Sequence, residues 1–400
     1  MDKTLKKTAV ACALMMFAFS GLITNGFSAY QPFILSQNGF TNTQGSTILT
    51  VRNIGSLLAM LFAGMLYKKV SVRKGVALAG LCGGTGLLLF SVFHSFWGYC
   101  FAGLIMGASF GLGGMIPLAV ISARGFGDKK TKILSVCAAM TGLSTFGFPF
   151  LIVSVTERYG LSAMFRLEGA FELAVTAAVY ILMKDGPAEN IKEENVQAEN
   201  RVPSAYTPLS RGETVLFFFI ALFAGATGFA GITHLSVLCT GEGLSPQTAA
   251  AAVMVSGIAL TVSKALYASV KEHIGAHGSQ WLYGAMLLSG QLLFLLIAKS
   301  TAVLYISVSL FSAGIAFLTV GVADWADVLA PAGKQAGLVQ LSQIAYMAGG
   351  LAFSSIPGII ADAHGGSYTG AYLVFAALSA AAVLLNLYEC KKHRKQEPKA

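Results

Sequence analysis

Charged side chains are scarce in this sequence, and their scarcity defines its class. Asp, Glu, Lys and Arg make up 11% of the 400 residues, less than half of the roughly 25% that soluble domains carry. Hydrophobic residues make up 55%, and the mean hydropathy is +0.69. This composition excludes a set of ordinary soluble domains and indicates a protein with many membrane-spanning segments.

Cysteine pairs and nucleotide-binding motifs are missing as well. The six cysteines are scattered, without a Cys-x-x-Cys pair or a Cys/His cluster, so they indicate neither a disulfide framework nor a metal site. A Gly-x-x-x-x-Gly-Lys-Ser/Thr loop is absent, which argues against ATP-driven transport by this chain. We therefore expect no enzyme activity, no catalytic residue, no metal and no cofactor.

Apolar runs long enough to cross a bilayer, about 20 residues each, recur along the chain. The first run follows Lys3, Lys6 and Lys7, an order that is also typical of a signal peptide. It continues to about Leu35, which is too long for the apolar part of a signal peptide and favours a membrane span. The twelve predicted spans are residues 8–35, 45–67, 74–93, 97–123, 131–155, 161–183, 213–238, 246–270, 279–298, 301–326, 334–360 and 367–389.

One polar segment divides these spans into two sets of six. Residues 184–212 are charged and interrupted by proline, which is typical of a solvated linker. We predict an N-terminal six-helix bundle over residues 1–183, a cytoplasmic linker over 184–212, and a C-terminal six-helix bundle with a basic tail over 213–400. The expected fold class is an all-α membrane protein with twelve transmembrane helices in two pseudo-symmetric six-helix bundles.

Positive charge is distributed unequally between the two sides of this topology. With the N-terminus inside, all but five of the 27 Lys and Arg fall in cytoplasmic segments. Such a bias predicts a multi-pass protein of the cell membrane with both termini in the cytoplasm. It also explains the net charge of +9 by contact with anionic lipid, without a nucleic-acid partner. The five exceptions are Arg52, Arg158, Arg166, Lys264 and Lys299.

The two halves carry related loop sequences at a nearly constant offset. "GMLYKKVSVRKG" from Gly64 corresponds in position to "ASVKEHIGAHGS" from Ala268, 204 residues later. "ERYGLSAMFR" from Glu157 corresponds to "DAHGGSYTGA" from Asp362, 205 residues later. Two parallel halves of this kind predict a substrate site near the membrane midplane, between the halves.

Along nearly its whole length, the sequence resembles the major facilitator superfamily of transporters. The family's loop between spans 2 and 3 has the pattern Gly-x-Leu-x-Asp-x-x-Gly-x-Arg-Arg/Lys. Here Lys68 stands at the acidic position and Ser71 at the second glycine, while Gly64, Leu66, Arg73 and Lys74 match. The family loop latches the cytoplasmic side, so the resemblance implies a gate there. The candidates for this gate, including two acids at the cytoplasmic end of span 10, are Gly64, Lys68, Arg73, Glu272, Gly275, Asp324 and Asp327.

Within this superfamily, three segments look most like oxalate–formate antiporters and monocarboxylate porters. They are "GFSAYQPF" in span 1, "GLGGMIP" in span 4 and "GGSYTGAY" between spans 11 and 12. The resemblance implies transport of a small mono- or dicarboxylate. In these porters a cation on span 8 binds the substrate carboxylate, and Lys264 matches it. The second cation that oxalate-type members carry on span 11 is missing here, and Arg52 is the candidate to replace it.

Arg52 and Lys264 are the two cations expected at membrane depth with no acid one turn away on their own helix. A guanidinium binds a carboxylate through two parallel hydrogen bonds, and an ammonium acts as a point charge. The alternatives are an ion pair between Arg52 and Glu172, and snorkelling of Lys264 to the interface. The polar residues expected to complete the substrate site are Asn25, Tyr30, Gln31, Gln340, Gln343 and Tyr346.

Two acids on span 6, Glu168 and Glu172, are candidates for proton coupling, with a structural role as the alternative. Proton-linked relatives have an acid one turn before the span-8 cation, where this chain has Leu260. This difference favours antiport over proton symport.

The resulting prediction is a monomeric secondary transporter in the lipid bilayer that moves a small organic anion by alternating access. The alternatives are an exporter of a neutral or drug-like solute and, from another class, a membrane sensor or scaffold that transports nothing.

Overall fold

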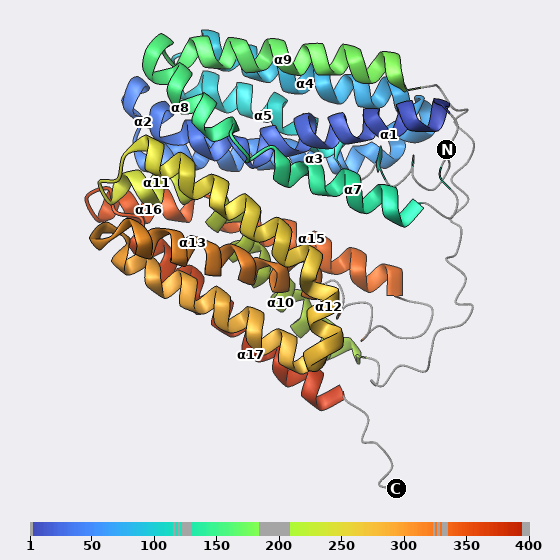
Figure 1. Cartoon of the computed structure of the whole chain (residues 1–400), viewed down its shortest axis with the longest axis vertical. Coiled ribbons are helices and arrows are strands. Elements are labelled where there is room, and N and C mark those ends of the chain that lie inside the picture. Colours follow the sequence, from blue (N-terminus) through green and yellow to red (C-terminus); the bar gives the residue numbers. More distant parts are fainter. Residues whose placement is uncertain are drawn as a thin grey trace, which may run out of the picture. The chain divides into compact units, whose positions relative to one another are not determined.

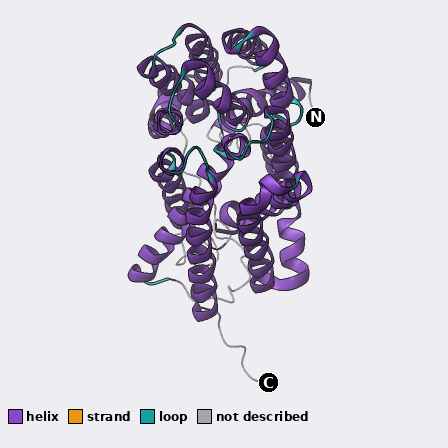
Figure 2. Cartoon of the chain, turned by 90° about the vertical axis from the view of Figure 1, so that its left-hand side faces the viewer, coloured by secondary structure: helices purple, strands orange, loops and turns teal. Residues whose placement is uncertain are grey.

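The chain is a bundle of helices in every part that the structure describes. The computed structural model describes residues 3–114, 117–118, 121, 126, 130–183, 209–322, 325, 329 and 335–393. Within these ranges the residues are almost entirely helical, short loops join the helices, and no strand occurs (Figure 2). Eleven helical segments there are long and apolar enough to cross a membrane. The predicted all-α membrane fold is therefore confirmed.

Figure 1 labels the helices of both halves where there is room. Those of the first half are α1 (Lys3–Met15), η1 (Met16–Leu22), η2 (Gly26–Tyr30), α2 (Gln31–Asn38), α3 (Asn42–Lys69), α4 (Val72–Val92), α5 (Phe96–Gly113), α7 (Lys130–Leu143), α8 (Phe148–Tyr159) and α9 (Leu161–Leu182). Those of the second half are α10 (Arg211–Thr233), α11 (Leu235–Gly241), α12 (Pro246–Leu293), η4 (Phe294–Lys299), α13 (Thr301–Ala316), η5 (Phe317–Gly321), α15 (Gln335–Phe353), α16 (Ile356–Ala363) and α17 (Thr369–His393).

The first span changes its helix type twice along its length. The α-helix α1 continues into the π-helical turn η1 and then, past Asn25, into the 3-10 turn η2. Each change of type alters which backbone carbonyls the helix itself uses, as happens at π-bulges and 3-10 turns. The hydroxyl of Thr24 donates to the carbonyl oxygen of Ser20 in this stretch. Backbone groups of span 1 therefore become acceptors for side chains of neighbouring helices.

Helices α3 and α5 pack closely because the face of α5 that meets α3 carries glycines. A side chain at Gly107 would overlap the backbone carbonyl of Arg52, and one at Gly111 would overlap that of Ser56. The hydroxyl of Ser56 donates to the carbonyl oxygen of Gly107 at 2.9 Å. Glycines at Gly-x-x-x-Gly spacing are typical of such close packing between membrane helices.

Helix α9 occupies the predicted sixth span and is not one of the eleven apolar segments. It carries three charged residues, Arg166, Glu168 and Glu172. Glu168 and Glu172 are 2% and 0% exposed, whereas Arg166 is exposed. The two acids are buried because α9 packs against α4, where Gly84 and Gly169 let the backbones approach. Figure 1 shows α9 and α4 side by side.

Spans 8 and 9 join without a conventional loop. Both belong to α12, whose direction changes at Gly275, with φ of 75°. A left-handed φ is costly for any residue except glycine, so this position requires its glycine. The corresponding residue of the first half, Ser71, has φ of −59° and precedes α4 as its N-cap. Serine is therefore accepted at the glycine position of the first loop.

The chain forms two compact units. Unit 1 contains Met1–Ile191, Thr233–Ile258 and Ser355–Tyr368. Unit 2 contains Lys192–Ile232, Ala259–Ser354 and Thr369–Ala400. Helix α16 packs against α3 inside unit 1, and α11 packs against α2. The predicted linker 184–212 lies outside the described residues except for its last four positions, so the predicted domain boundaries stay a prediction.

Candidate substrate site

Arg52 is held inside unit 1 entirely by neutral groups. Its side chain on α3 is 1% exposed. Nη1 donates to the carbonyl oxygen of Ile23 at 3.1 Å, at the point where span 1 changes helix type. Nη2 and Nε donate to Oδ1 of Asn53 at 3.2 and 3.4 Å, and the ring of Phe27 lies 5.2 Å from Cζ. Within the described part of the chain, this guanidinium has no carboxylate partner.

Three polar candidates from span 1 lie in the same unit, and they differ in whether their side chains have hydrogen-bond partners. Nδ2 of Asn25 donates to the carbonyl oxygen of Thr141 at 3.1 Å, which ties span 1 to span 5. The hydroxyl of Tyr30 donates to the Glu168 carboxylate. Gln31 is 1% exposed, and neither atom of its amide has a hydrogen-bond partner. Gln31 is thus the span-1 candidate whose polar atoms remain available to a ligand.

A cluster of aromatic rings surrounds Tyr30 and reaches Phe27 beside Arg52. The ring of Phe165 stacks on Tyr30 at 4.5 Å and on Phe90 at 5.2 Å. Phe90 in turn lies 5.5 Å from Phe27 and 5.0 Å from Tyr99. These packed rings hold the Tyr30 hydroxyl on Glu168 and present an aromatic face to Arg52.

The acids of α9 are buried without a cation. Glu168 accepts the Tyr30 hydroxyl, whereas both oxygens of Glu172 lack a hydrogen-bond partner. No ion pair joins Arg52 to Glu172 or to Glu168 in the described residues, so the structural pair considered from the sequence does not form. Arg52 instead uses its donors on Ile23 and Asn53.

Unit 2 holds the other cation and the remaining polar candidates. Lys264 on α12 has an exposed side chain without a hydrogen bond or ion pair to any described residue. Its neighbour Ser263 faces a different helix, since its hydroxyl donates to the carbonyl oxygen of Ala313 at 2.6 Å. Tyr346 on α15 packs across Gly228 of α10. The side chains of Gln340 and Gln343 lie outside the described residues.

The predicted gate residues are described only in part. Nε of Arg73 donates to the carbonyl oxygen of Tyr180 at 2.7 Å, and its guanidinium lies 3.9 Å from the centre of the Tyr180 ring. Arg73 thereby caps the C-terminal end of α9, where a cation is favourable. Glu272 is exposed, and Gly275 forms the bend in α12. Gly64 lies within α3, while Asp324, Asp327 and the side chain of Lys68 lie outside the described residues.

Unit 1 contains a polar seam that no sequence pattern predicted. The carboxylate of Asp362 accepts hydrogen bonds from the backbone N–H groups of Asn42 and Thr43 at 3.0 and 2.8 Å, and from Nδ2 of Asn42 at 2.9 Å. It therefore caps the N-terminus of α3, where an anion is favourable. The hydroxyl of Tyr368 donates to Oδ1 of Asn42 at 3.0 Å.

Three more contacts continue this seam. Nε2 of Gln247 donates to both oxygens of Glu157, at 2.6 and 2.7 Å. The hydroxyl of Ser46 lies 3.0 Å from Nε2 of His234. The hydroxyls of Thr50 and Ser355 lie 2.7 Å apart. In the sequence, Glu157 and Asp362 stand out only as members of a repeated loop, and the repeat does not indicate their partners.

A Gly-x-Ser-x-Gly sequence in span 4, Gly107 to Gly111, does not form a nucleophile elbow. That motif requires a sharp turn between a strand and a helix, whereas these residues lie inside α5. Ser109 is 0% exposed. The segment serves helix packing.

Membrane-length helices that bury a cation and acids are typical of membrane transporters. The sequence profile of the Major Facilitator Superfamily matches residues 12–354. The chain belongs to this superfamily, as its loop motif predicted, and is a transporter and not an enzyme.

Individual relatives are distant. The uncharacterized MFS-type transporter YhjX of Escherichia coli (strain K12) is 27% identical over 148 residues, which span 36% of each chain. A D323A mutant of the nucleoside transporter NupG has a TM-score of 0.76 at 11% identity, covering 97% of this chain and all of that chain. A D-xylose-proton symporter has a TM-score of 0.74 at 12% identity, covering 96% of both. These structures share the fold.

Proposed function

We propose that this protein is a secondary transporter of a small organic anion, a mono- or dicarboxylate, and that Arg52 binds its carboxylate. The observation that supports the proposal is the burial of Arg52 among neutral partners. An unpaired charge in a membrane protein is costly, and such residues mark substrate or ion pathways. A carboxylate would complete the fork of donors that the Ile23 and Asn53 oxygens use only in part.

Transport of a neutral solute is the alternative in the same class. Structural neighbours are described as nucleoside and D-xylose transporters, and those substrates are not carboxylates. At 11–12% identity the likeness extends to the fold only. The absence of an acid partner for Arg52 among the described residues favours the anion.

Uptake of labelled oxalate, formate, lactate and pyruvate into proteoliposomes tests the proposal. We expect Arg52→Gln to lower uptake of the transported acid by about tenfold or more, because a lost charge-assisted hydrogen bond is worth about 1.5–3 kcal/mol. Arg52→Lys should be intermediate, since it keeps the charge and loses the fork. Arg166→Gln, which removes an exposed arginine of α9, is the matched control.

Lys264 is the corresponding candidate of unit 2 and enters the same assay as Lys264→Gln. If the Arg52→Gln and Lys264→Gln variants both transport carboxylates at the wild-type rate, the anion proposal is wrong. Uptake of a neutral sugar or nucleoside by the wild type, with no carboxylate transported, would favour the alternative.

Orientation and assembly complete the proposal. The positive-inside bias supports a place in the cell membrane with both termini in the cytoplasm. We propose a monomer as the transporting unit. Fusions of a reporter to each terminus test the orientation, and mass measurement in detergent tests the monomer.

A further inference from the structure

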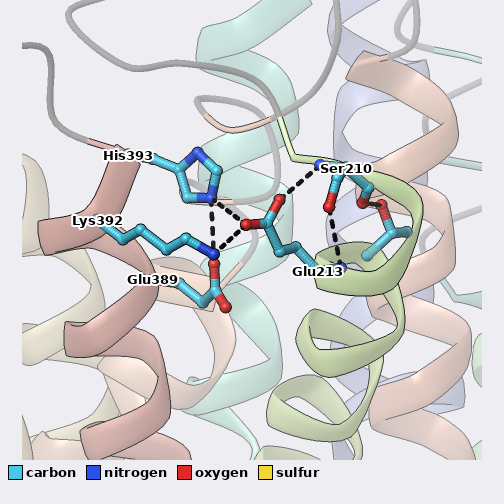
Figure 3. Close-up of polar contacts among 6 residues, drawn as sticks. Ser210, Glu213, Glu389, Lys392 and His393 are labelled. Atoms are coloured by element: carbon cyan, nitrogen blue, oxygen red, sulfur yellow. Dashed lines mark hydrogen bonds and ion pairs between the residues drawn. The ribbon is translucent and has the colours of Figure 1, made fainter.

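Three side chains that could bind a metal lie together where α10 begins and α17 ends, in unit 2. Glu213 lies in the first turn of α10, and Glu389 and His393 lie one turn apart at the end of α17 (Figure 3). Nε2 of His393 lies 3.3 Å from Oε1 of Glu213 and 3.3 Å from Oε2 of Glu389. One nitrogen and two carboxylate oxygens thus lie within 4.8 Å of one another.

The burial of this cluster is unusual for carboxylates. The side chain of Glu389 is 1% exposed and that of His393 7%. Oε2 of Glu389, which points to His393, accepts no hydrogen bond. One turn earlier on the same helix face, Asn386 is 0% exposed and its amide has no hydrogen-bond partner. Buried polar atoms of this kind normally have partners, so a missing ligand is the simplest explanation.

The distances suit a metal better than an ion pair. A charge-assisted N–H···O bond is about 2.7–2.9 Å long, shorter than the two 3.3 Å separations. A tetrahedral ion with bonds of about 2.0 Å holds its ligands about 3.3 Å apart. The other oxygen of Glu213 accepts the backbone N–H of Ser210 at 2.7 Å, the kind of contact that orients a metal-binding carboxylate.

We propose that Glu213, Glu389 and His393 form a binding site for a divalent first-row metal ion such as Zn²⁺. One imidazole and two carboxylates match the ligands that Zn²⁺ takes with an open fourth position. Nζ of Lys392 now forms an ion pair with Oε1 of Glu213, and the side chain of Lys392 is 47% exposed. It occupies the position of a cation and must swing out into solvent when the metal enters.

Zinc titration of the full-length protein in detergent, stripped with a chelator beforehand, tests the site. We expect one ion per chain to bind at this site, and Glu389→Gln or His393→Gln to weaken its binding by about 100-fold, the upper end of what loss of an outer-shell partner already costs. Lys392→Met should strengthen binding, because it removes the competing ammonium. Cobalt should give a visible absorption band in the wild type that His393→Gln removes.

Two other histidines need a control. His273 and His277 lie four residues apart in α12, and both are exposed. The double variant His273→Ala/His277→Ala should keep the wild-type affinity. Loss of binding in that variant, or wild-type affinity in both Glu389→Gln and His393→Gln, would overturn the proposal. Should those two variants fail to fold, Lys392→Met decides: unchanged or weaker binding contradicts the site.

Discussion

Some buried polar side chains in unit 1 have hydrogen-bond partners and others have none. Those with partners are candidates for a structural role, and those without are candidates for a functional one. Asn25 and Tyr30 each donate to a protein acceptor. Gln31 and Glu172 are deeply buried and have no hydrogen-bond partner on their side chains. An unsatisfied buried group costs about 1–3 kcal/mol. A ligand bound to Gln31, or a proton bound to Glu172, would therefore offset the free-energy cost of burying these groups without a partner.

The hydrogen bond from Tyr30 to Glu168 should be important for stability. Tyr30→Phe leaves a buried carboxyl group without its donor and should destabilise the protein by about 1–3 kcal/mol. Glu168→Gln should cost less, because the amide oxygen still accepts the hydroxyl. Thermal unfolding of both variants and of the double variant measures the coupling between them. Independent, additive losses would contradict the described bond.

Glu172 should be the better candidate for proton coupling, because its oxygens lack the partner that Glu168 has. If a pH gradient drives uptake into proteoliposomes, Glu172→Gln should abolish that drive and leave exchange of labelled for unlabelled substrate intact. An amide cannot carry the proton yet keeps the size of the side chain. Wild-type uptake that ignores the pH gradient would exclude coupling and favour antiport.

At the scale of the helices, the sequence predicted what depends on local composition. The length of the apolar runs predicted the membrane spans. The hydropathy of a segment does not depend on its helix type, so the π and 3-10 turns of span 1 could not be predicted. These turns leave the carbonyl oxygen of Ile23 free to accept a hydrogen bond from Arg52. That partner of Arg52 comes from another helix, and no local pattern predicts it.

The contact of α3 with α5 gives a test with an internal control. Gly107→Val places a side chain where the carbonyl of Arg52 lies, and overpacking of this kind costs about 1–3 kcal/mol or more. Its melting temperature should fall, and transport with it, because the clash displaces the backbone of Arg52. Gly212→Ala in α10 meets no atom within 4 Å and should be neutral. Equal melting temperatures for the two variants would show that α3 and α5 are less tightly packed than described.

At the scale of the whole chain, the repeat relates the two contacts of the seam that involve a carboxylate. Glu157 and Asp362 are 205 residues apart, and so are their partners Asn42 and Gln247. Each acid lies near the end of one span and binds the start of another, so the same kind of contact occurs twice. The repeat was visible in the sequence, but the pairing was not, because it depends on which helix ends meet.

This seam should act as a latch on the predicted outer side. Asp362→Asn removes the charge that caps α3, which is worth about 1–2 kcal/mol, and should raise the population of an opened seam roughly 5- to 30-fold. A cysteine at Ser355, whose hydroxyl now contacts Thr50, reports the opening through its rate of labelling by a membrane-impermeant maleimide. Adding Glu157→Gln should increase the rate further, since the second contact is its repeat.

The matched control for the latch is the loss of an acid that takes no part in the seam. Glu272 is an exposed acid of α12 in unit 2, so Glu272→Gln removes the same charge and should leave the labelling rate at Ser355→Cys unchanged. An equal increase in Glu272→Gln and Asp362→Asn would mean that net charge, and not the cap of α3, controls the rate. Unchanged labelling in both Asp362→Asn and the double variant with Glu157→Gln would mean that other contacts keep the seam closed, because neither acid would then be holding the helix ends together.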